Sequence, residues 1–112
     1  MRTTTSQYGV AILLMVFAVA SGPAFAQDSG NPIVGHELAA RWCASCHVVD
    51  AAIQHQGTDF VPSFAAIAAI PSTTAASLTA FLSTPHGQMP DYALSRADIA
   101  NISAYILSLR KH

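Results

Sequence analysis

The stretch Cys43-Ala44-Ser45-Cys46-His47 places two thiols three residues apart, with a histidine directly after the second. This is the spacing of c-type haem attachment. Residues three and four apart share one face of a helical turn, so both thiols can reach one edge of a porphyrin while the imidazole turns under its iron. The pattern predicts that Cys43 and Cys46 bind one haem c covalently and that His47 is its first axial ligand.

Three other interpretations of these residues are weaker. A thioredoxin-like redox pair also uses Cys-x-x-Cys, but it belongs in a βαβ setting that this sequence does not predict. A structural zinc site needs four ligands, often from two such pairs, and this chain has only two cysteines. A disulfide between positions three apart would brace almost nothing. Haem attachment is therefore favoured.

The N-terminal residues follow the pattern of a secretory signal peptide. Arg2 precedes an apolar run of 11 residues at 10–20, and Ala24-Phe25-Ala26 fits the small-x-small cleavage rule. The run is too short for an ordinary transmembrane helix, although an uncleaved anchor remains the alternative. We expect cleavage of residues 1–26 and a mature domain of 86 residues at 27–112, with no transmembrane segment.

Charge and size narrow the functional classes. Removing the signal takes away Arg2 and no acid, which leaves four Lys/Arg against six Asp/Glu, or a net charge of −2 before haem charges. A basic patch for nucleic acid or anionic lipid is not indicated, and Lys111 is the only lysine. A domain of this size has a marginal core, to which a buried haem would add apolar volume.

The periodicity after the signal predicts an all-α domain. Capping residues and prolines divide it into helices from Asn31-Pro32 to about Cys46, from Ser63 to Ala69, from Ser72 or Thr73 to before Pro85, and from Ser95 to Leu109. The last begins with the capping-box form Ser95-Arg96-Ala97-Asp98. We expect Leu78, Phe81 and Leu82 to form one apolar face, and Arg110 to His112 to be a solvated tail.

A second axial ligand is predicted in the loop His86-Gly87-Gln88-Met89-Pro90. Met89 is the only methionine outside the signal, and a loop between glycine and proline is a poor place for a core gap-filler. A thioether is a soft ligand suited to haem iron, and His/Met ligation raises the reduction potential. His86 is the alternative ligand in the same loop, and His55 in a polar loop is a weaker one.

Taken together, these residues resemble those of the class I cytochromes c, the small electron carriers. The resemblance runs over residues 27–112 and rests on Gly35, Cys43 to His47, Pro62-Ser63-Phe64, Met89-Pro90, and Ile99 to Leu109 with Tyr105. It implies that the N- and C-terminal helices cross at Gly35 against Tyr105, with short helices and loops around one covalently bound haem. It also implies that the carbonyl of Pro62 accepts a hydrogen bond from the second ring nitrogen of His47.

Two positions depart from that pattern. Many members carry an aromatic residue four positions before the first cysteine, where this chain has Ala39, and Trp42 stands next to Cys43 instead. Many also hold a haem propionate with a tryptophan, and Trp42 is in the wrong region for that role. The sequence therefore names no propionate partner.

The expected function is one-electron transfer in the periplasm, without enzymatic activity. The resemblance is closest to short bacterial members, which often serve periplasmic dehydrogenases or oxidases, as a monomer or a subunit of a hetero-complex. One alternative is a cytochrome subunit held permanently on such an enzyme. The other is a haem protein with a labile sixth position that binds a gas or turns over peroxide, for which His86 would be the nearby acid–base group.

Overall fold

The computed structural model describes residues 29–52, 57, 60–87 and 89–111. The predicted signal peptide at 1–26 and His55 lie outside these residues. The described residues form four α-helices, α1 (Pro32–Trp42), α2 (Phe64–Ala69), α3 (Ala75–Leu82) and α4 (Arg96–Ser108). The predicted all-α class is confirmed. Among the described residues, no helix is long and apolar enough to cross a membrane.

Three helices begin at the capping residues that the sequence predicts. The Asn31 side chain accepts from the backbone N–H groups of the first turn of α1, and Ser63 caps α2 in the same way. At α4, the Ser95 hydroxyl accepts from the N–H of Asp98, whose carboxylate in turn accepts from the N–H of Ser95. One boundary differs, because α1 ends at Trp42 and the chain continues to Cys46 only as a turn.

The start of α3 corrects the sequence prediction. The capping residue is Thr74, whose hydroxyl accepts from the N–H of Ser77, and not Ser72 or Thr73. Thr73 is buried and its hydroxyl donates to the carbonyl of Ile67 at 2.7 Å, so it is already used in closing the turn after α2. The helix therefore begins at the next hydroxyl along the chain.

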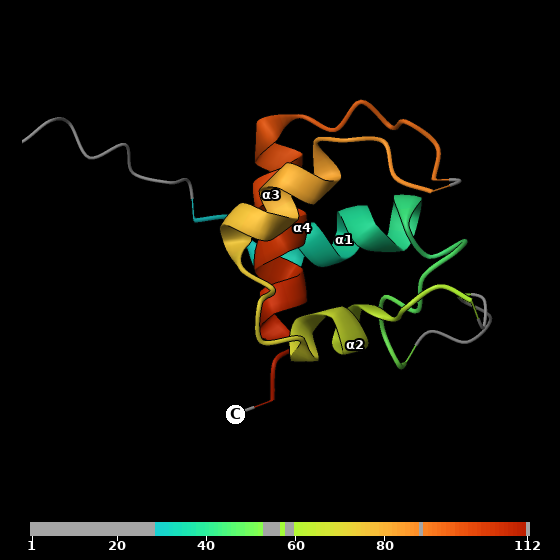
Figure 1. Cartoon of the computed structure of the whole chain (residues 1–112), viewed down its shortest axis with the longest axis vertical. Coiled ribbons are helices and arrows are strands. Elements are labelled where there is room, and N and C mark those ends of the chain that lie inside the picture. Colours follow the sequence, from blue (N-terminus) through green and yellow to red (C-terminus); the bar gives the residue numbers. More distant parts are fainter. Residues whose placement is uncertain (1–28, 53–56, 58–59, 88, 112) are drawn as a thin grey trace, which may run out of the picture.

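Helix α4 contacts all three other helices and forms the centre of the fold (Figure 1). Its closest neighbour is α1, because Gly35 has no side chain. A Cβ atom at Gly35 would overlap the carbonyl of Asn101 and lie 2.9 Å from the Cβ of Tyr105. The predicted crossing of the first and last helices at this glycine is confirmed.

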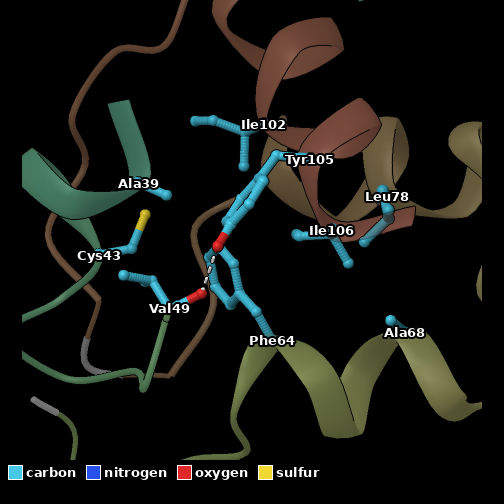
Figure 2. Close-up of a cluster of buried hydrophobic side chains, with 9 residues drawn as sticks. All are labelled: Ala39, Cys43, Val49, Phe64, Ala68, Leu78, Ile102, Tyr105 and Ile106. Carbon is cyan, nitrogen blue, oxygen red and sulfur yellow. Dashed lines mark hydrogen bonds between the residues drawn. The ribbon is translucent and has the colours of Figure 1, made fainter. Parts of the chain in front are cut away.

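The core lies where α4 meets the other helices and the segment after α1 (Figure 2). Its buried cluster consists of Ala39, Cys43, Val49, Phe64, Ala68, Leu78, Ile102, Tyr105 and Ile106. Phe81 was expected on the apolar face of α3 beside Leu78, but its side chain is 56% exposed.

The end of the chain holds a contact that the sequence did not predict. Arg110 is exposed, as expected for a solvated tail, but its Nε also donates to the carbonyl of Ala68 at 3.1 Å and its terminal nitrogen donates to the carbonyl of Thr73 at 2.6 Å. Both carbonyls belong to the C-terminal end of α2 and the turn that follows it. The guanidinium therefore ties that turn to the end of α4.

Candidate functional site

The two thiols sit on a helical turn that continues directly from α1. The N–H of Cys43 donates to Ala39 at 2.8 Å, and the N–H of His47 donates to the carbonyl of Cys43 at 2.8 Å. Cys43 is buried in the core cluster whereas Cys46 is exposed, and neither forms a disulfide. The turn thus holds two free thiols and an imidazole within five residues.

The buried position of Cys43 also changes the acidity of its thiol. Burial raises the pKa of the Cys43 thiol from 9.0 to about 11, and the nearby charge of Cys46 adds to the effect. The Cys43 thiol is therefore protonated at neutral pH in this packed state, and a buried, protonated thiol is a poor nucleophile.

The imidazole of His47 is fixed through one ring nitrogen. Its Nδ1 lies 2.7 Å from the carbonyl oxygen of Pro62, and its ring centroid lies 5.4 Å from that of Phe64. A carbonyl oxygen only accepts hydrogen bonds, so Nδ1 must carry a proton. In the neutral ring, the lone pair is then on Nε2, which is the atom that would bind a metal.

Backbone contacts bring the segment that carries Pro62 back to the turn. The N–H of Phe64 donates to the carbonyl of Val48 at 3.0 Å, and the N–H of Gly57 donates to that of Ala44 at 3.3 Å. Gly57 has a φ of +78°, and a Cβ atom there would lie 2.7 Å from a side-chain methyl of Val48. A glycine is required at this position because the chain passes so close to the turn.

Met89 lies in the loop between α3 and α4, and its N–H donates to the carbonyl of His86 at 3.1 Å. The side chain lines a small pocket together with His86, Tyr92 and apolar residues at the ends of the loop. In Figure 1 this loop (orange) and the turn after α1 (green) lie at the same end of the molecule. The segment that carries Met89 and the turn that carries Cys43, Cys46 and His47 are thus at the same end of the fold.

His86, the alternative ligand, is engaged with its own side of the loop. Its ring centroid lies 4.1 Å from that of Phe81, and its Nδ1 lies 3.1 Å from the carbonyl of Thr84. These contacts hold the imidazole against the end of α3.

A ring contact that the sequence did not predict joins the two halves of the site. Trp42 and Tyr92 stack with their centroids 6.2 Å apart and their planes 12° from parallel. Trp42 immediately precedes Cys43, and Tyr92 lies three residues after Met89. The sequence marked Trp42 only as unusual. No periodicity in the loop points to Tyr92, so no sequence pattern predicts its contact with Trp42.

The donor set fits haem c better than the alternatives. It offers two free thiols, an imidazole whose second nitrogen is already bonded, and a thioether on the loop between α3 and α4. In the part of the chain that the structure describes, no three His, Cys, Asp or Glu side chains come together as a metal-binding group. A structural zinc site would need four such ligands.

Comparisons with known proteins agree with this assignment. Residues 30–106 match the family described as cytochrome C oxidase, cbb3-type, subunit III. The chain is also 46% identical over 102 residues to cytochrome c-552 of Bradyrhizobium diazoefficiens, and the alignment covers 91% of this chain and 93% of that protein. No solved structure gives a significant match.

Proposed function

The chain belongs to the cytochrome c family represented by cytochrome c oxidase, cbb3-type, subunit III, and from this membership we propose that it is a periplasmic one-electron carrier with a single haem c ligated by His47 and Met89. Members of this family are electron-transfer proteins. The observation that carries the proposed ligation is the 2.7 Å contact between His47 Nδ1 and the Pro62 carbonyl, which leaves Nε2 free for iron.

Each residue has a distinct task in this proposal. Cys43 and Cys46 form the two thioether bonds to the haem. Pro62 orients His47 and makes its Nε2 a stronger electron-pair donor to the iron. Met89 fills the sixth position with a soft sulfur. The chemistry that bound haem c supplies is a one-electron change at its iron, and a filled coordination sphere keeps rearrangement during that change small.

Met89 is a better candidate for the sixth ligand than His86. The His86 ring packs at a tilt against that of Phe81 and its Nδ1 lies 3.1 Å from the Thr84 carbonyl, so ligation by this residue would require loss of these contacts. Met89 instead lines the small pocket between the ends of this loop, together with Leu82, Tyr92 and Leu94. A closed His/Met site also argues against gas binding or peroxide turnover, which need an open position.

The ligation is tested on purified holoprotein and two single variants. Wild-type ferric protein should show the weak long-wavelength absorption band of iron bonded to methionine sulfur, and acid acetone should not extract the pigment. Met89→Ala should lose the band and have a lower reduction potential than the wild type. His86→Ala should retain both the band and the wild-type potential. Loss of the band in His86→Ala, or its absence from the wild type, would contradict the assignment.

The proposed location rests on the N-terminal 26 residues and on attachment of c-type haem outside the cytoplasm. Cell fractionation followed by mass spectrometry should find the haem protein in the periplasm, beginning at Gln27. A membrane-bound product that retains residues 10–20 would instead indicate an uncleaved anchor.

A permanently bound subunit is the second candidate, because the matching family is described as a subunit of an oxidase. The cytochrome c-552 relative favours the free carrier, since its name describes a cytochrome and not a subunit of an enzyme. Gel filtration of native extract separates the two. Red protein eluting at the size of the domain supports the carrier, and coelution with a dehydrogenase or oxidase supports the subunit.

A further inference from the structure

The loop that carries Met89 has few internal constraints. Between Ser83 and Ser95 it contains no helix among its described residues. Its hydrogen bonds are local, as in the Asp91 carboxylate that accepts from the N–H of Ala93 at 2.9 Å. Ala93 itself has a φ of +48°, which a non-glycine residue adopts at a cost in strain. Something outside the loop must therefore fix its path.

Tyr92 provides such a contact, because its ring stacks on that of Trp42 at a centroid distance of 6.2 Å and an interplanar angle of 12°. A centroid distance of this size with nearly parallel planes describes an offset stack, a favourable arrangement for two aromatic rings. Trp42 is the last residue of α1 and is rigidly placed by that helix. The stack thus connects the residue beside the first attachment cysteine to the loop that holds the thioether.

We propose that the Trp42–Tyr92 stack is a positioning device that holds Met89 at the haem iron. This inference rests on the proposed His/Met ligation. With Tyr92 anchored, only two residues separate the anchor from Met89, and one of them is Pro90, whose ring fixes its φ. The Met89 sulfur then has far fewer accessible positions than it would have on an unanchored loop. Its effective concentration at the iron is correspondingly higher.

The tyrosine ring, and not its hydroxyl, carries this role. Among the described residues, the Tyr92 hydroxyl has no hydrogen-bond partner, whereas the ring has the stack. Trp42 and Tyr92 are also both half-buried at the edge of the fold and lie outside the fully buried cluster. Removing the ring should therefore loosen Met89 more than it weakens the core.

The test is competition between Met89 and imidazole for the ferric iron of the purified holoprotein. Tyr92→Leu should increase imidazole affinity about threefold to tenfold, the range expected when one aromatic pair is lost. Tyr92→Phe keeps the ring and should stay within about twofold of the wild type. Trp42→Leu removes the other ring and should match Tyr92→Leu, and the double variant should add little to either.

Ile33→Ala is the matched control, because Ile33 lies on the same helix as Trp42 and is 72% exposed. It should leave imidazole affinity unchanged. The long-wavelength band of methionine-bound iron should weaken in Tyr92→Leu and persist in Tyr92→Phe, with far-UV circular dichroism unchanged in both.

The outcomes separate this inference from the proposed function. A wild type without the methionine band would overturn the His/Met ligation itself. A wild type with the band, but with Tyr92→Leu and Trp42→Leu binding imidazole as weakly as the wild type, would overturn the positioning role alone. An equal rise in affinity in Tyr92→Phe would also overturn it, because the ring would then not be the determining group.

Discussion

Tyr105 connects three parts of the protein through one side chain. Its ring lies edge-on to that of His36 at 4.9 Å and tilted against Phe64 at 6.3 Å. Its hydroxyl donates to the carbonyl of Val49 at 2.7 Å, as the dashed line in Figure 2 shows. The segment after His47 is thereby tied to α4, so this tyrosine supports the site from the core side.

Replacing Tyr105 by phenylalanine should lower the free energy of unfolding by about 1–2 kcal/mol, because a buried hydrogen bond to a backbone carbonyl is lost. Guanidinium denaturation of the holoprotein measures this. Tyr92→Phe is the matched control and should change the free energy of unfolding by about 0.5 kcal/mol at most. Equal effects of the two substitutions would show that the Val49 bond contributes nothing specific.

The same residue makes stability depend on alkaline pH. Burial raises the pKa of Tyr105 above its ordinary value of 10.0, and the negative charge of Asp50 raises it further. The folded state therefore keeps this proton to higher pH than the unfolded chain does, and its contribution is complete below pH 10.0 and lost as the pH rises through the higher folded value. Denaturation curves on both sides of pH 10.0 should show a steeper loss in wild type than in Tyr105→Phe.

At the scale of elements, helix starts could be predicted where the signal is local. Asn31, Ser63 and Ser95 each cap the helix that follows them, and the cap needs only the next few residues. Thr74 could not be distinguished from its hydroxyl neighbours, because the choice depends on Thr73 bonding to Ile67 in another element. The partners of such bonds are decided by the tertiary fold.

The site also contains residues that the local sequence predicts and contacts that depend on the tertiary fold. The spacing of Cys43, Cys46 and His47 lies within one turn, so the motif alone predicts them. The contact of His47 with Pro62 joins residues 15 apart and was expected only from family resemblance. The stack of Trp42 and Tyr92 joins residues 50 apart in sequence and follows no period, so only the fold reveals it.

The packing of α1 on α4 gives a prediction at Gly35. On an isolated helix, Gly→Ala would stabilise by about 1 kcal/mol. Here the added Cβ would overlap the carbonyl of Asn101, so the helices must separate. Gly35→Ala should instead lower the free energy of unfolding by about 1–3 kcal/mol.

Thermal or chemical denaturation of the holoprotein measures this change. Glu37→Ala, an exposed substitution on the same helix, should stay within about 0.5 kcal/mol of the wild type. A stabilised Gly35→Ala variant would mean that α1 and α4 do not approach closely at this glycine.

For the molecule as a whole, the core is small. Ten apolar residues are buried among those described, and the largest fully buried side chains are Ile102, Ile106 and Val49. Cys43 belongs to this cluster, so a porphyrin bonded to it would extend the apolar core directly. A chain of this size has little stability in reserve. Covalent attachment would therefore contribute to the fold as well as to electron transfer.

The low charge of the protein predicts weakly steered encounters. With the proposed cleavage, and before haem charges, the polypeptide at 27–112 has a net charge of −2, since removing residues 1–26 takes away only Arg2 from a chain of net charge −1. Small net charge gives little long-range attraction or repulsion for salt to screen. The rate of electron self-exchange between oxidised and reduced molecules should change by less than about tenfold between low and physiological ionic strength.

Two charge-reversal variants test whether the position of a charge affects the self-exchange rate. NMR line broadening of mixed oxidised and reduced protein measures these rates. Arg41→Glu and Arg96→Glu each take the net charge from −2 to −4. Arg41 is exposed and lies two residues before Cys43, whereas Arg96 begins α4. Repulsion near the attachment turn should slow exchange most, so Arg41→Glu should show the lower rate at low salt and the steeper recovery. A steep dependence already in the wild type would show that local charge, and not the small net charge, governs the encounter.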